Sequence, residues 1–249
     1  MIRALILGGT SDAHWLADAV ARAGLEATYS YGGRTRAPAT QPLPTRSGGF
    51  GGASGLAEYI RREKITHVID ATHPFAAEIS RNAVVACAGT GAQLIALERA
   101  PWLKTPGDKW IEVADLTSAV AALPIDRARV FLAIGRQHIG AFGAKPQHAY
   151  TMRFVDPPDE PSPFPDADVI VARGPFALES ELDMIRSRRI EWIVARNSGG
   201  SGARAKIDAA RELGLPVVML KRPELPGRLR VKSVAEVMQW LGHRTCLGA

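Results

Sequence analysis

The stretch Ile2-Arg3-Ala4-Leu5-Ile6-Leu7-Gly8-Gly9-Thr10-Ser11-Asp12 decides the fold class of this chain. Its apolar run is typical of a β-strand that is buried on both faces, and the run stops at a pair of glycines. Apolar side chains then recur at helical spacing over residues 12–23, which predicts a helix with Ser11 or Asp12 as its N-cap. A strand, a glycine turn and a helix in this order form the first unit of a parallel α/β sheet.

Strand-like and helix-like segments continue to alternate along the chain. Further strands are predicted at residues 26–31, 67–71, 94–98, 110–114, 129–134, 150–155, 169–172, 192–195 and 217–220. Further helices are predicted at residues 55–64, 74–89, 178–189, 203–213 and 234–241. This alternation predicts an α/β fold with mainly parallel sheets. About ten strands are more than one small domain usually holds, so we expect two domains, residues 1–125 and residues 126–249.

The composition excludes several classes of protein. With 46% hydrophobic and 22% charged residues, the chain is ordinary for a globular protein and unlike a disordered one. Apolar runs are too short for a membrane span, and the N-terminal run is too short for a signal peptide, so we expect a cytoplasmic protein. The two cysteines and six histidines show no metal-ligand spacing, so no metal site is predicted.

The net charge of +6 is concentrated in one stretch. Residues 196–232 hold nine basic and three acidic residues, which accounts for the whole surplus. Such a stretch fits a polyanionic partner, either nucleic acid or a small molecule with many carboxylates or phosphates, or simply a solvated basic face. Aromatic residues are only 6% of the chain and are not interleaved with the basic residues, which argues against a nucleic-acid partner.

Three motifs in the first half are placed where open α/β sheets bind ligands. Gly8, Gly9, Thr10 and Ser11 form a glycine turn before a helix, which is suited to phosphate or is only a tight turn. After the strand at residues 26–31 there is no acidic residue to bind a ribose, whereas Arg34 and Arg36 suit a 2′-phosphate, or form a solvated loop. Thr72 and His73 follow the strand at residues 67–71, where a lone histidine is often structural.

Loops in the second half bring arginines and glycines to the ends of three predicted strands. Together with the next helix and the last strand, they supply side chains that would converge on an anionic ligand, with a solvated surface as the alternative. The candidates are Arg136, Arg173, Asn197, Ser198, Gly199, Lys206 and Arg222. Upstream, the glycine-rich stretch around Gly51 would let the backbone approach a flat ligand closely, or forms a mobile loop.

In combination, the motifs resemble the precorrin-6A reductase family of cobalamin (vitamin B12) biosynthesis. The matching stretches are Leu7-Gly8-Gly9-Thr10, Gly32-Gly33-Arg34-Thr35, Gly49-Phe50-Gly51-Gly52, Asp70-Ala71-Thr72-His73-Pro74-Phe75-Ala76, Arg173-Gly174-Pro175-Phe176, Asn197-Ser198-Gly199-Gly200 and Lys206-Ile207. One departure is Arg196, where the resemblance leads us to expect lysine. The resemblance implies two Rossmann-like domains with a ligand cleft between them.

The resemblance also implies NADPH-dependent reduction of one double bond of an anionic tetrapyrrole, precorrin-6A, to give precorrin-6B. Pyrophosphate would be held by the glycine turn and the 2′-phosphate by Arg34 and Thr35, while Thr72 and His73 would lie near the nicotinamide. The candidate residues of the second half would bind substrate carboxylates, and His73 is a candidate proton donor. Neighbouring enzymes of the pathway are candidate partners, whereas nucleic acid and membranes are not expected.

Other functions stay open on the sequence. The substrate could be the cobalt-containing form of precorrin-6A. The chain could instead be a non-catalytic α/β protein that binds an anionic ligand, or an enzyme of nucleotide-sugar or methyl transfer on a similar fold.

Cofactor choice provides a test of Arg34. We expect Arg34→Ala to raise the KM for NADPH about 10-fold or more, because one charge-assisted contact contributes about 1.5–3 kcal/mol. The KM for NADH serves as the control and should hardly change, since NADH lacks the 2′-phosphate. Equal losses with both cofactors in steady-state assays would show that Arg34 does not recognise that phosphate.

Overall fold

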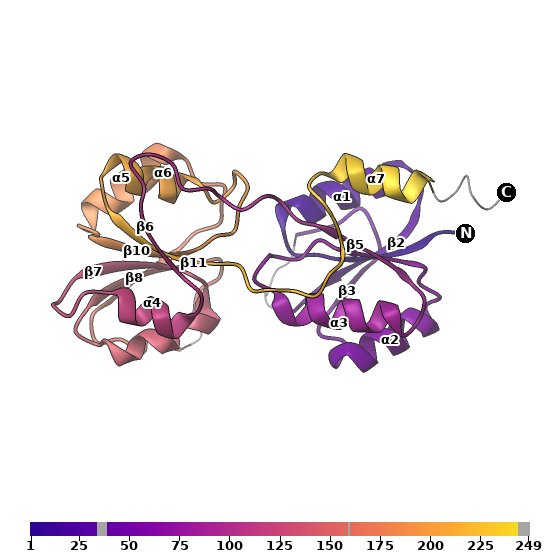
Figure 1. The fold of residues 1–249 in the computed structure, drawn as a ribbon, viewed down its shortest axis with the longest axis horizontal. Helices are drawn as coiled ribbons and strands as arrows, with labels where there is room; N and C mark the ends of the chain where they lie inside the picture. Colours follow the sequence, from indigo (N-terminus) through magenta and orange to yellow (C-terminus); the bar gives the residue numbers. More distant parts are fainter. Residues whose placement is uncertain (34–38, 159, 244–249) are drawn as a thin grey trace. The chain divides into compact units, whose positions relative to one another are not determined.

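The computed structural model describes residues 1–33, 39–158 and 160–243. The chain divides into two compact units (Figure 1). Unit 1 consists of Met1–Ala100 together with Pro223–Ala249, and unit 2 consists of Pro101–Arg222. Both units are parallel α/β sheets, which confirms the predicted fold class.

Unit 1 is built on a six-stranded sheet in the order β12-β5-β4-β1-β2-β3, and all its neighbouring strands are parallel. The strands are β1 (Arg3–Leu7), β2 (Glu26–Tyr31), β3 (Thr45–Ser47), β4 (His67–Asp70), β5 (Gln93–Leu97) and β12 (Leu229–Val231). The helices are α1 (Ser11–Arg22), α2 (Gly52–Arg62), α3 (Ala77–Ala88) and α7 (Val234–His243). Helices α1 and α7 cover one face of the sheet, and α2 and α3 cover the other (Figure 1). After β3 the chain returns to the middle of the sheet, where β4 pairs with β1. The strand order therefore reverses between β1 and β4.

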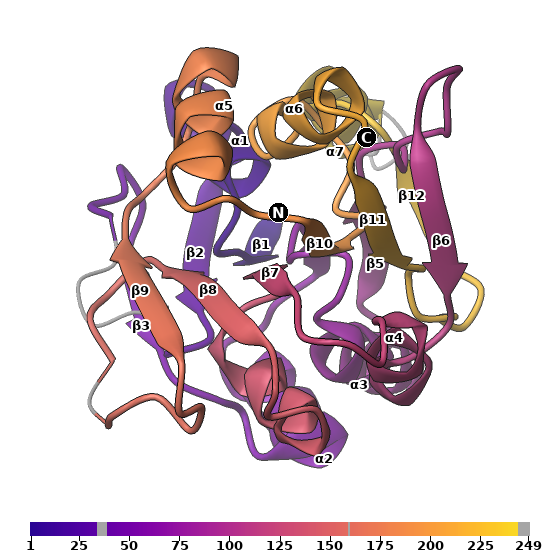
Figure 2. The ribbon, with the colours of Figure 1, turned by 90° about the vertical axis from the view of Figure 1, so that its left-hand side faces the viewer.

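Unit 2 also has a six-stranded sheet, in the order β6-β11-β10-β7-β8-β9, but its edge strand β6 comes first in the unit, whereas the edge strand β12 of unit 1 comes last. The strands are β6 (Lys109–Val113), β7 (Arg129–Ala133), β8 (Ala149–Phe154), β9 (Ala167–Val171), β10 (Trp192–Arg196) and β11 (Pro216–Leu220). The helices are α4 (Leu116–Ala122), the 3-10 helix η1 (Arg136–Ala144), α5 (Leu178–Ser187) and α6 (Ala205–Glu212). Helices α5 and α6 pack on one face of the sheet and α4 lies on the other (Figure 2).

The predicted domain boundary after residue 125 is wrong, because the chain crosses between the units twice. Strand β6 and helix α4 precede that boundary, yet β6 pairs with β11 in unit 2. After β11 the chain returns to unit 1, where β12 pairs with β5 and α7 buries Val237 and Leu241 against α1. Both crossings look locally like ordinary βα alternation, since the partner of a parallel strand is distant in sequence.

Four elements were not predicted from the sequence: β3, α4, η1 and β12. Strands β3 and β12 have only 3 residues each, and half or more of each is exposed or partly exposed, so no buried alternation marks them. Helix α4 is a 7-residue helix, and η1 contains two internal glycines that weaken a helical pattern. Among the described residues, no helix combines the length and the apolar character that crossing a membrane requires.

Candidate functional site

The glycine turn after β1 rests on the ring of Tyr29. The Gly8 N–H donates to the Ser30 carbonyl at 3.0 Å, and the Gly9 N–H donates to the Tyr29 hydroxyl at 2.9 Å. A Cβ atom on Gly8 would lie 2.2 Å from the Tyr29 ring, and Gly9 has a φ of +108°, so both positions favour glycine. The N–H groups of Gly8 and Gly9 are therefore used inside the protein, and these residues shape the turn.

Helix α1 begins directly after this turn, and its N-cap is Thr10 rather than Ser11 or Asp12. The Thr10 hydroxyl accepts from the Ala13 N–H at 3.1 Å and donates to the Ala71 carbonyl at 2.8 Å. The N–H groups of Ser11 and Asp12 lie in the first turn, where the helix itself provides no acceptor and the helix dipole is positive. They are the groups of this turn best placed to bind a phosphate.

Two arginines that the sequence analysis missed lie at the same edge of unit 1. Arg99, two residues after β5, pairs with the Asp12 carboxylate at 3.1 Å and so offsets an acidic side chain at the helix N-terminus. Arg46 from β3 donates to Ser30 Oγ at 2.7 Å, and its guanidinium lies 3.8 Å from the centre of the Phe50 ring. The position of Arg99 after a predicted strand could have identified it, whereas Arg46 depends on the unpredicted strand β3.

Some predicted residues of this edge have a different or undefined position. Arg34 and Thr35 lie outside the described residues, so the prediction of a 2′-phosphate site there stays a prediction. Gly51 is the N-cap of α2, with a φ of +81° and no side chain to fill the space beside it.

Thr72 and His73 lie in the loop after β4. The strand order reverses between β1 and β4, so this loop and the glycine turn after β1 lie on either side of the reversal point. The buried carboxylate of Asp70 accepts from the Thr72 hydroxyl at 2.6 Å and from the Thr72 N–H at 3.2 Å. His73 Nδ1 accepts from the Phe75 N–H at 3.2 Å, so a neutral His73 ring carries its proton on Nε2. Topology therefore brings the Thr10 and Thr72 loops to one edge, as predicted for a ligand site.

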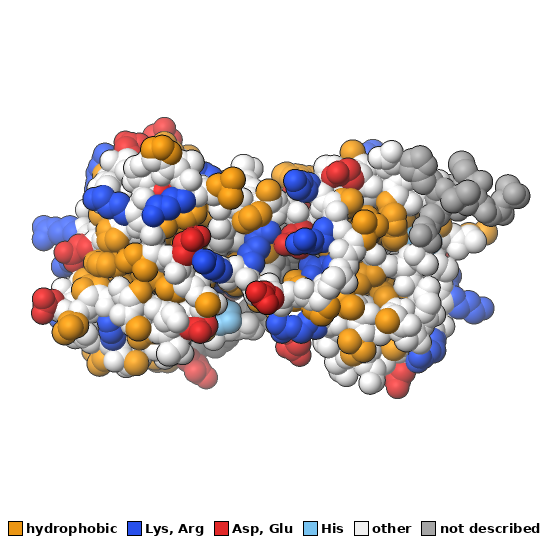
Figure 3. Space-filling model, viewed as in Figure 1, with side chains coloured by type: hydrophobic (Ala, Val, Ile, Leu, Met, Phe, Trp, Pro, Cys, Tyr) orange, Lys and Arg blue, Asp and Glu red, His pale blue; other side chains and the backbone are white. Residues whose placement is uncertain are grey.

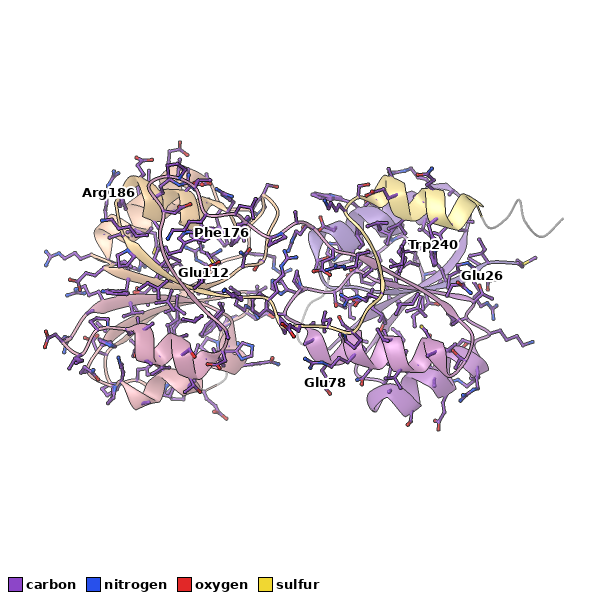
Figure 4. The ribbon with its side chains drawn as sticks, viewed as in Figure 1. Glu26, Glu78, Glu112, Phe176, Arg186 and Trp240 are labelled. Carbon is purple, nitrogen blue, oxygen red and sulfur yellow. The ribbon has the colours of Figure 1, made fainter. Side chains whose placement is uncertain are left out.

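Unit 2 has a cluster of buried charges on the face covered by α5 and α6. Arg153 makes two hydrogen bonds to the Glu181 carboxylate, at 2.6 and 3.1 Å, and the side chains are 11% and 2% exposed. The Arg153 guanidinium lies 4.1 Å from the centre of the Phe176 ring, which is labelled in Figure 4. Arg153 and Glu181 were not among the predicted site residues, because they lie inside a strand and a helix rather than in a strand-end loop.

Lys206 in the first turn of α6 belongs to the same cluster. Its ammonium group donates to the Ala203 carbonyl at 2.6 Å and lies 5.5 Å from the centre of the Trp102 ring. Burial lowers the pKa of Lys206 to about 8. The Glu181 carboxylate acts against this shift, whereas the nearby guanidinium groups add to it. Lys206 is therefore a cation in a costly environment, which an incoming anion would relieve.

The loop after β10 is held by bonds within unit 2. The Asn197 side chain accepts from the Trp102 N–H at 2.7 Å and donates to the Trp102 carbonyl at 2.9 Å. Arg222 donates to the carbonyls of Asn197 and Ser198, both at 3.0 Å. Asn197, Ser198 and Gly199 are buried, so the side chains of Asn197 and Arg222 build the loop rather than face an open site.

Arg136 and Arg173 are brought together by the loop after β8. Arg136 donates to the carbonyls of Asp156 and Pro157, at 3.1 and 3.0 Å. Arg173 is half-exposed and pairs with the Asp156 carboxylate at 3.4 Å. Both arginines are accessible from solvent, and the Asp156 carboxylate lies against Arg173.

The basic stretch over residues 196–232 is divided between the two units. It belongs partly to unit 2 and partly to unit 1, and several of its cations pair with acidic side chains. Basic and acidic groups are interspersed on the visible face of each unit (Figure 3). The positive charge that matters for a ligand is therefore local, as at Lys206, rather than a broad basic face.

A stability measurement tests the structural role of Asn197. We expect Asn197→Ala to lower the free energy of unfolding by about 2–4 kcal/mol, because two buried hydrogen bonds to Trp102 are lost. Chemical denaturation would measure this loss, and Ser201→Ala, at an exposed position in the same loop, is the matched control. An unchanged stability for Asn197→Ala would return Asn197 to the candidate ligand contacts.

The chain is similar to known proteins over nearly its whole length. The family model for precorrin-6x reductase CbiJ/CobK matches residues 3–242. A precorrin-6A reductase of Rhodobacter capsulatus is 56% identical over 97% of this chain and 96% of that protein. A solved structure of CobK precorrin-6A reductase has a TM-score of 0.94 and 56% identity, covering 98% of this chain and 97% of that one. A cobalt-precorrin-6A reductase of Priestia megaterium is 27% identical over 97% of this chain and 98% of that protein. These matches confirm the family resemblance, and the chain belongs to the precorrin-6x reductase family.

Proposed function

We propose that this protein reduces one ring double bond of precorrin-6A to give precorrin-6B, with NADPH as the reductant. Membership of the family makes the chain an oxidoreductase of cobalamin biosynthesis that acts on a CH–CH group with a nicotinamide cofactor. The 56% identical relative is named for precorrin-6A and the 27% identical one for the cobalt form, which supports a metal-free substrate. A cytoplasmic location and an association with neighbouring enzymes stay predictions.

The helix N-terminus beside the glycine turn is the observation that carries the cofactor proposal. The Ser11 and Asp12 N–H groups would bind the pyrophosphate, with Arg99 adding positive charge beside Asp12. No acidic residue follows β2, and Arg46 lies there, which favours a phosphorylated ribose and hence NADPH. Bound NADPH would supply a hydride, and these residues of unit 1 would bind and orient it.

Substrate carboxylates are assigned to the cations of unit 2. Arg136 and Arg173 are accessible, and Arg173 already pairs with the Asp156 carboxylate, while Lys206 carries a charge that burial disfavours. Arginine and lysine at several separate places suit a macrocycle with acidic groups around its rim. Binding energy would then be divided among several modest contacts.

His73 is the proposed source of the proton that joins the carbon next to the site of hydride addition. The Phe75 N–H fixes the ring through Nδ1, so that Nε2 is the nitrogen able to give a proton to a ligand. His73 also lies in the same loop as Thr72, next to the presumed cofactor edge of the sheet.

A spectrophotometric assay tests the proposed function. Purified protein would be incubated with precorrin-6A or cobalt-precorrin-6A, each with NADPH or NADH, and the product identified by mass. We expect the fastest turnover with precorrin-6A and NADPH. Preference for the cobalt substrate or for NADH would contradict the corresponding part of the proposal.

The role of Lys206 predicts a pH dependence of substrate binding. A carboxylate binds the ammonium form, so affinity should be level below about pH 8 and fall up to about 10-fold per pH unit above it. The ligand-free protein should change in the opposite sense: its free energy of unfolding rises from about pH 8 to 10.5, because only the unfolded chain still holds the proton there.

Two variants separate this effect from other titrations. Lys206→Met should bind the substrate more weakly and without the fall above pH 8, whereas Lys206→Arg should keep its affinity to higher pH because guanidinium stays charged. Titration of substrate affinity against pH for the three proteins is the measurement. The same alkaline fall in all three would remove Lys206 from the substrate site.

The proton-donor role predicts a large effect on turnover. His73→Ala should lower kcat by about 100-fold or more while substrate binding persists. His138→Ala, a histidine of unit 2, is the control for general effects of histidine removal. A loss below about 5-fold would make His73 a positioning or structural residue.

A further inference from the structure

We infer that the Thr72 hydroxyl is a hydrogen-bond acceptor for the carboxamide N–H group of the nicotinamide, with its own proton held by Asp70. This inference rests on the proposed function, since it assumes that unit 1 binds a nicotinamide cofactor. Because the Thr72 hydroxyl would act only as an acceptor, it would favour a ligand that has a hydrogen-bond donor at this position.

The Thr72 hydroxyl has one proton, which it donates in a hydrogen bond to the Asp70 carboxylate. The Thr72 Oγ1 lies 2.6 Å from Asp70 Oδ1, and the Thr72 N–H donates to the same oxygen at 3.2 Å. An ionised carboxylate can only accept, so the hydroxyl must be the donor in this pair. Both lone pairs of Thr72 Oγ1 stay available, so towards a third group this oxygen can only accept.

A buried arginine lies beside the Asp70 carboxylate. Arg228 lies 3.7 Å from Asp70 Oδ2 and 3.1 Å from the Glu98 carboxylate. The side chains of Asp70 and Arg228 are 2% and 6% exposed, so their attraction is only weakly screened by solvent.

Arg228 reaches this place because the chain returns to unit 1. It directly precedes β12, which pairs with β5 on the far side of β4. The segment that follows unit 2 therefore supplies the guanidinium beside the carboxylate that accepts from Thr72.

The location of Thr72 fits the nicotinamide end of the cofactor. Dinucleotides cross the point where the strand order of such a sheet reverses, with the pyrophosphate at the first helix. In unit 1 this point lies between β1 and β4, and the Thr10 hydroxyl joins the N-terminus of α1 to the Ala71 carbonyl beside Thr72. The second nucleotide would thus lie toward the β4 loop, and its carboxamide is the amide donor of that half.

A comparison of two ligands tests this acceptor role without relying on turnover. NADP⁺ has the carboxamide, whereas 3-acetylpyridine adenine dinucleotide phosphate has a methyl ketone there and lacks the N–H donor. We expect wild type to bind NADP⁺ about 5- to 10-fold more tightly than the analogue, the scale of one hydrogen bond. Thr72→Val should reduce that ratio to about 1 while binding of the analogue is retained.

Thr72→Ser is the matched control, because it keeps the hydroxyl and should keep the ratio. Thr72→Ala repeats the test if the valine variant does not fold, as judged by circular dichroism. Equal weakening of both ligands, or an unchanged ratio, in a folded variant would overturn the inference and leave the proposed function intact. Failure of the wild type to bind either dinucleotide would instead overturn the cofactor proposal, and the inference with it.

Discussion

The Thr10 side chain joins the two loops on which the ligand edge of unit 1 depends. Its hydroxyl caps α1 through the Ala13 N–H and at the same time donates to Ala71, at the end of β4. The N–H groups of the first helical turn and the Thr72 loop are therefore held at a fixed spacing. Below this link, Tyr29 supports the glycine turn, which is possible only because Gly8 lacks a Cβ. One hydroxyl and one buried ring thus position both halves of the proposed cofactor site.

Unit 2 holds two cations, Arg153 and Lys206, near its interior. Arg153 pairs with Glu181 through two hydrogen bonds, so the two charges balance each other within the protein. Lys206 donates to a carbonyl and lies over the face of Trp102, and burial acts against its charge. This difference separates a structural ion pair from a cation that gains from an external carboxylate.

Some of the residues that were predicted to bind the ligand have a structural role instead. Asn197 binds the Trp102 backbone, and Arg222 binds the carbonyls of the same loop, although both residue types suit an acidic ligand. Sequence reasoning assigned them to the substrate because they follow strands at the expected edge. A single sequence does not show that the segment around Trp102 enters unit 2 from unit 1 and that its backbone groups bind the Asn197 side chain.

The sequence by itself determined the α/β class, the major strands and helices, and the glycine turn at the start of α1. These features depend on hydrophobic periodicity and on residues adjacent in the chain, which a single sequence displays. Only the tertiary structure decided that β6 joins unit 2 and β12 joins unit 1, and that Arg46, Arg153 and Arg228 lie beside the candidate sites. Those placements depend on which parallel strands pair across long stretches of chain, and such pairing energies leave no local pattern in the sequence.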